Sequence, residues 1–171
     1  VSAMIDGLTN VAVVGSGIGG GFSLNYSSVS PVGRHDMHHG SARDPVLSAA
    51  IATVTQMQFR EIARVARRLQ DTPEPGGEGS MLDHTVIVFV GDNGEQHHST
   101  ASEFPVVLLG GQAGLAAGGR TLVYPRMASA GHRQLSNLWN TLGYSVGEAL
   151  DEFGGEGALR RAAGPLGELF G

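Results

Sequence analysis

The sequence contains no cysteine and no lysine, and each absence excludes particular chemistries. Without cysteine there is no disulfide bond, no thiolate nucleophile and no cysteine-ligated zinc. The 11 residues of the lysine and arginine class are all arginine, so neither a Schiff-base lysine nor a P-loop lysine is available. No apolar run approaches the roughly 20 residues of a membrane-spanning helix. The sequence therefore predicts no membrane span.

The composition is that of a folded globular domain. Of 171 residues, 41% are hydrophobic and 16% are charged, which is enough for one domain with a core. A net charge of −5 disfavours nucleic acid or an anionic membrane as a partner. No signal peptide is visible, and the chain begins at Val1 without a methionine. We therefore expect a fragment or a processed chain, with any targeting signal on a preceding part.

Short apolar and β-branched runs predict the strands of an α/β fold. We expect three strands in one sheet, at Val11–Val14, Thr85–Val90 and Pro105–Leu109. Residues 22–44 are rich in serine, contain Pro31 and show no helical period, so a long ordered loop is expected there.

One long amphipathic helix is expected over about residues 45–70, covering the sheet. Asp44 is a good N-cap, and Pro45 suits the first helical position. The stripe that should be buried consists of Leu47, Ile51, Val54, Gln58, Ile62, Val65 and Leu69. Four arginines in its second half fit a solvated face matched to the helix dipole better than a binding patch: Arg60, Arg64, Arg67 and Arg68. A shorter helix is expected near Leu135–Leu142, ended by Gly143.

The segment from Gly15 to Gly20 matches the G-x-G-x-x-G pattern of dinucleotide-binding loops. That pattern needs a helix directly after it, whose N-terminus faces the pyrophosphate. The following residues are serine-rich and break at Pro31, which is poor helix material. We therefore expect no regular helix in residues 15–44 and no bound dinucleotide, although a nucleotide-binding protein remains a minor alternative.

Five of the seven histidines lie in two short segments and suggest a divalent-metal site. The strand ending at Val90 is followed by Asp92, Asn93, His97 and His98, and the upstream segment holds His35, His38 and His39. Zinc takes histidine nitrogens and carboxylate oxygens, whereas calcium prefers oxygens alone. We expect His38 or His39 to converge with Asp92 and His98 at the carboxyl end of the sheet. His84 and His132 stand apart and are read as structural.

Two stretches resemble a known group of hydrolases. Leu82–Phe89 followed by Gly91-Asp92-Asn93-Gly94, and His98-Ser99 followed by Phe104–Gly111, resemble late elements of the alkaline phosphatase and sulfatase superfamily. The order of elements from about Leu8 to Gly147 is similar to a family of uncharacterised exported bacterial proteins named for an HxxSHH motif. Met37 stands where that motif has serine, and Arg34 where it has its first histidine, unless His35 substitutes for it.

The resemblance implies that residues 1–153 are the C-terminal portion of an alkaline-phosphatase-like domain, followed by a Gly- and Ala-rich tail at 154–171. It implies a metal-dependent hydrolase of phosphate or sulfate esters, with zinc or calcium as the ion and no nucleotide cofactor. The nucleophile would come from an N-terminal half or another subunit, and the location would be the periplasm or cell surface. A non-catalytic accessory or structural subunit with a degenerate site is the alternative.

Overall fold

The computed structural model describes residues 1–15, 26–91, 104–111, 114–115, 118–127, 129–150, 153 and 163–171. The elements in chain order are α1 (Ser2–Ile5), α2 (Arg34–Gly40), α3 (Pro45–Gln70), the 3₁₀ turn η1 (Met81–His84), β1 (Val86–Val90), β2 (Val106–Gly110), α4 (Leu135–Ser145) and the 3₁₀ turn η3 (Gly167–Leu169). No helix in these ranges is both long and apolar enough to cross a bilayer.

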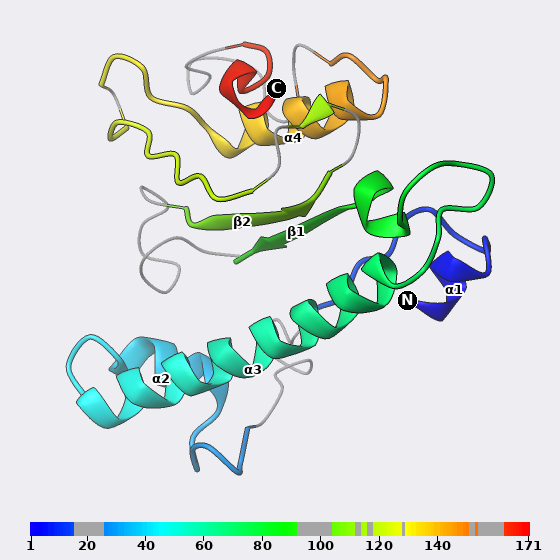
Figure 1. Cartoon of the computed structure of the whole chain (residues 1–171). Coiled ribbons are helices and arrows are strands. Elements are labelled where there is room, and N and C mark those ends of the chain that lie inside the picture. Colours follow the sequence, from blue (N-terminus) through cyan, green and yellow to red (C-terminus); the bar gives the residue numbers. More distant parts are fainter. Residues whose placement is uncertain are drawn as a thin grey trace.

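The elements form layers around a small antiparallel sheet. Figure 1 shows α3 along one side of β1 and β2 and α4 on the other side. The aromatic rings of Phe59 on α3 and Phe89 on β1 lie 4.7 Å apart, which fixes α3 against that face. Mixed helix and strand is therefore confirmed, in the coarse sense of the predicted α/β class.

The predicted long helix is confirmed as α3, with the predicted N-cap. The Asp44 side chain accepts a hydrogen bond from the Val46 backbone N–H at 2.8 Å, and Pro45 opens the helix. The stripe predicted to be buried is the inner side: Val54 and Leu69 are buried and its other members are half-buried. The residues between them are mostly exposed, so the helical period identified the face correctly.

Two of the three predicted strands pair with each other. β1 and β2 are antiparallel, with Val86 opposite Gly110 and Val90 opposite Val106. The third prediction was wrong, because Val11–Val14 lies in irregular structure with all four side chains exposed. A β-prone run becomes a strand only when a neighbouring strand takes its backbone hydrogen bonds.

The prediction of no helix in residues 15–44 was also wrong. Arg34–Gly40 forms α2, which packs on the N-terminal half of α3. Its anchor is Met37, fully buried in a cluster with Ala50 and Val54 of α3. Tertiary burial of one side chain stabilises a helix that is too short for its local sequence to support alone.

The predicted helix near residues 135–142 is confirmed as α4, which continues through Gly143 to Ser145. Its inner face is unusually polar. The Asn137 side-chain amide donates to the Gly164 carbonyl at 2.8 Å, and the Thr141 hydroxyl accepts from the Leu166 N–H at 2.8 Å. These bonds hold residues 164–166 against α4.

The hydroxyl group of Tyr124 has a raised pKa. Burial is the larger cause and the Glu168 carboxylate the second, and together they raise the pKa of Tyr124 to about 12.

Gly110, the last residue of β2, requires glycine for two reasons. Its φ is +98°, a conformation that L-residues rarely adopt, and a Cβ there would collide with the Thr85 backbone carbonyl. We expect Gly110→Ala to lower the free energy of unfolding by more than about 2 kcal/mol in urea denaturation. Gly119→Ala is the matched control, since its φ is +73° and its Cβ would meet nothing within 4 Å. Equal losses in the two variants would contradict a steric role for Gly110.

Asp83 closes η1 just before β1. Its carboxylate accepts from the Ser80 N–H at 2.8 Å and from the Ser80 hydroxyl at 2.7 Å. These bonds, backbone first, lower the pKa of Asp83. Its contribution to stability is therefore present at neutral pH and is lost as the pH falls through the lowered pKa. We expect Asp83→Asn to be destabilising at pH 7 and nearly neutral in strong acid, measured by urea denaturation. An equal Asp83→Asn effect at both pH values would refute this.

Candidate functional site

The upstream histidine segment is held in place by α2. Met37 faces α3 and is fully buried, so the helix presents its other side to solvent. At 100° per residue, His35 and His39 lie roughly opposite Met37, and His38 lies to one side. This agrees with exposure, because His35 and His39 are exposed and His38 is half-buried. One buried methionine thus sets the direction of two imidazoles.

His35 and His39 are one helical turn apart and their rings meet. The two Nε2 atoms are 3.2 Å apart, and the ring centroids are 4.8 Å apart with the planes at 71°. At this distance one Nε2 donates a hydrogen bond and the other accepts it. Both residues were among the candidate ligands predicted from sequence, but their pairing was not predicted, because the segment was expected to be a loop. The signal it missed is the i, i+4 spacing, which brings side chains together only on a helix.

The geometry of the pair also fits a transition-metal ion. With each nitrogen about 2.0–2.1 Å from zinc, two ligands lie about 3.3–3.4 Å apart at a tetrahedral angle and about 2.9 Å apart at a right angle. The observed 3.2 Å falls between these values. Imidazole nitrogens suit zinc, copper or nickel and do not suit calcium. Of the two ions expected from sequence, these donors fit zinc.

The other predicted ligands, Asp92, Asn93, His97 and His98, lie outside the described residues. So does most of the Gly15–Gly20 segment. Within the described ranges, no three or more metal-binding side chains gather at one point. His35 and His39 are therefore a pair, with no third such side chain gathered beside them among the described residues.

The direction of β1 decides near which end of α3 this strand ends. β1 starts beside the C-terminal end of α3, where η1 packs, and its Phe89 contacts Phe59 in the middle of α3. The strand therefore runs back along α3 toward the end that carries α2. Phe59 and Ala50, which contacts Met37, are nine residues apart, or about 13 Å along the helix axis. β1 therefore ends nearer than it starts to the end of α3 on which α2 packs (Figure 1).

His84 and His132 each bond to a backbone carbonyl. His84 Nε2 donates to the Glu78 carbonyl at 2.8 Å, and His132 Nδ1 donates to the Pro125 carbonyl at 2.8 Å. A ring nitrogen that donates its proton cannot at the same time ligate a metal. Each contact engages one nitrogen of its ring and fixes loop geometry, and the structural role expected from sequence stays a prediction.

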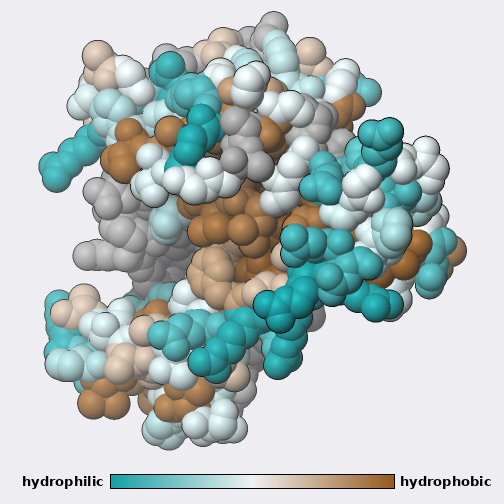
Figure 2. Space-filling model, viewed as in Figure 1, coloured by the Kyte–Doolittle hydropathy of each residue, from teal (hydrophilic) through white to brown (hydrophobic). Residues whose placement is uncertain are grey.

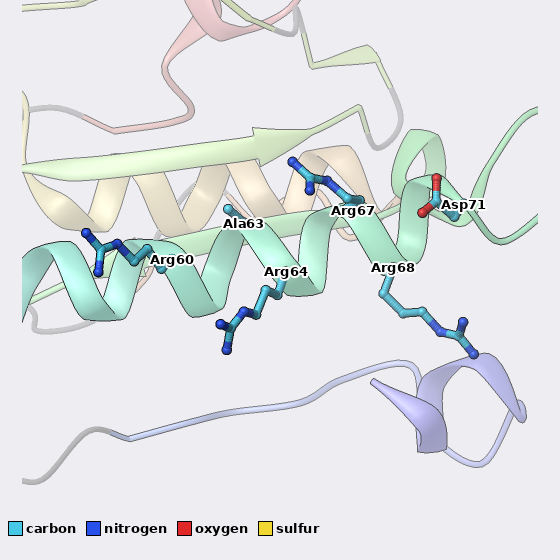
Figure 3. Close-up of a pocket in the computed structure, with 6 residues that line it drawn as sticks. All are labelled: Arg60, Ala63, Arg64, Arg67, Arg68 and Asp71. Carbon is cyan, nitrogen blue, oxygen red and sulfur yellow. The ribbon is translucent and has the colours of Figure 1, made fainter.

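A second concave surface lies on the C-terminal half of α3. A cavity of about 420 Å³ is lined by Arg60, Ala63, Arg64, Arg67, Arg68 and Asp71. Figure 3 shows the four guanidinium groups fanning out in different directions instead of converging on one point. Arg64 also forms an ion pair with Glu61 at 2.7 Å. This arrangement fits a solvated face that complements the helix dipole.

Comparison of the chain with protein-family models, with curated proteins and with solved structures finds no match.

The site depends on the burial of Met37, and this can be tested. We expect Met37→Ala to lower the free energy of unfolding by about 2–5 kcal/mol, because it leaves a cavity in the α2–α3 cluster. Met127, which is 61% exposed, is the matched control, and Met127→Ala should change stability by less than about 0.5 kcal/mol. Chemical denaturation followed by circular dichroism measures both. A neutral Met37→Ala would contradict the anchoring role.

Proposed function

We propose that this chain binds a divalent transition-metal ion through His35 and His39 and forms part of a metal-dependent hydrolase of phosphate or sulfate esters. The observation that supports the proposal most is the 3.2 Å separation of the two Nε2 atoms on the solvent-facing side of α2. Two imidazoles one turn apart on a helix are a chelating pair, as in zinc-binding helices. Zinc is the favoured ion, because the donors are nitrogens.

A catalytic metal site usually has three protein ligands and an open position. In the proposal, Asp92 and His98 complete the set that the pair begins, with Asn93, His97 and His38 as further candidates. Their support is the direction of β1, which ends on the side of α3 that carries α2. A bound metal would polarise the ester oxygen and stabilise the charge of the leaving group. The nucleophile would come from an N-terminal half of the same protein or from another subunit.

A second function has its own supporting observation. His35 and His39 hydrogen-bond each other, so the pair is satisfied without any ion. A non-catalytic accessory subunit with a degenerate site would keep such a contact and bind no metal. The two candidates therefore differ in one measurable property, the affinity of the pair for a transition metal.

We expect Zn²⁺ to bind the 171-residue chain and to raise its free energy of unfolding by about 2.7 kcal/mol at one hundred times the dissociation constant. His35→Asn and His39→Asn should each weaken binding at least about tenfold, because one nitrogen cannot chelate. His132→Asn is the control, since that ring is engaged with the Pro125 carbonyl. Isothermal titration calorimetry and thermal unfolding measure the two effects. Equal affinities in all four proteins would reject the site and favour the accessory subunit.

Whether Asp92 and His98 complete the proposed metal site is tested with separate variants. If Asp92 and His98 are ligands, Asp92→Ala and His98→Ala should lower zinc affinity about tenfold or more. If only the helix pair binds, both variants should match the wild type. The second result would leave the metal site intact and overturn the hydrolase-like ligand set.

A further inference from the structure

The segment Val11–Val14 has a strand-like sequence, but its side chains are exposed and not packed as they would be in a sheet. It consists of Val, Ala, Val and Val, yet Val11 is 74% exposed, Val13 is 93% exposed and Val14 is 92% exposed. Runs of three or more exposed apolar residues are unfavourable in water unless another surface covers them. Val13 and Val14 are the two most exposed valines of the described chain.

Most backbone groups of this segment also lack a hydrogen-bond partner among the described residues. Val11 bonds to the Thr9 hydroxyl, donating through its N–H at 3.2 Å and accepting through its carbonyl at 2.8 Å. Among the described residues, no hydrogen bond involves the backbone of residues 12–15. The segment therefore presents both the apolar side chains and the unsatisfied N–H and C=O groups that a strand presents to a neighbour.

The sheet has an edge, at β2, to which a segment such as Val11–Val14 could add as a strand. In the described part of the chain, β1 and β2 pair only with each other, so each has one edge without a strand beside it. β2 is the more exposed strand: its Val107 and Leu109 are each 36% exposed, whereas every residue of β1 is half-buried. Figure 2 shows apolar surface open to solvent between the upper and lower layers of the molecule. A two-stranded sheet is marginal by itself and gains from a third strand.

Within one molecule the segment and the edge are separated. Figure 3 shows the N-terminal segment, in blue, on the side of α3 opposite to the sheet. The helix stands between them, and its contacts with η1 and Phe89 hold it there. Pairing between copies does not require this separation to close.

We propose that Val11–Val14 of one copy adds as a third strand beside β2 of a second copy, and that the exchange is reciprocal. The four residues match the five-residue length of β2. Alternation places two side chains of the segment on the face that carries Val107 and Leu109, and we place Val11 and Val13 there because two valines bury more apolar surface than Ala12 and Val14. Because each copy supplies one segment and one edge, the contact closes as a symmetric dimer.

The oligomeric state tests the proposal directly. Light scattering on a size-exclusion column, over a concentration series, should show the wild-type chain as a dimer. Val13→Asp should weaken dimerisation at least about tenfold, because it places a charge in the apolar pairing. Val123→Asp is the matched control, since Val123 is 86% exposed but lies outside the segment, and it should leave the dimer intact. A monomeric wild type, or equal effects of the two variants, would overturn the proposal.

Cross-linking locates the contact. The chain has no cysteine, so any disulfide that forms must join introduced cysteines. Mixing the Val13→Cys chain with the Leu109→Cys or Val107→Cys chain under mild oxidation should give a mixed disulfide dimer, because adjacent strands lie about 4.7–4.9 Å apart. The Val123→Cys chain mixed with the same partners should give none. Equal yields in both mixtures would overturn the assignment to β2.

Discussion

The rest of the structure depends on the burial of one face of α3. This helix is 26 residues long, and it contacts α2 near one end and η1 near the other. Met37 packs at the first end and Phe89 packs against Phe59 near the middle. α3 contacts the histidine-bearing helix α2 and, through Phe59, also contacts β1 of the sheet. The position of α2, which carries His35 and His39, relative to β1 is therefore set by α3.

Local signals in the sequence predicted the elements whose own residues carry a helical period or a β-branched run. The period of the stripe and the Asp44-Pro45 start predicted α3, and the β-branched runs predicted β1 and β2. They failed at α2, because a helix of seven residues is held by the burial of Met37 against another part of the chain. They failed at Val11–Val14 for a related reason, since a strand requires a partner that the sequence of the segment does not specify.

For the candidate site, too, the sequence predicted which residues are candidates but not how they are arranged. Clustering of histidines identified His35, His38 and His39 as candidates without any structure. Only the helical conformation of α2 explains why His35 and His39 meet and why His38 stands to one side. The i, i+4 spacing carries no information until a helix is known to be present. The proposed contribution of Asp92 and His98 still rests on their position after β1 and on the family resemblance.

The central claim is that His35 and His39 act together as metal ligands. Pulsed electron paramagnetic resonance of the stoichiometric Cu²⁺ complex counts the imidazole nitrogens bound to the ion. The wild-type chain should show at least two coordinated imidazoles, and His39→Asn should show one fewer. A wild-type complex with one imidazole or none, or a spectrum that His39→Asn leaves unchanged, would contradict the account.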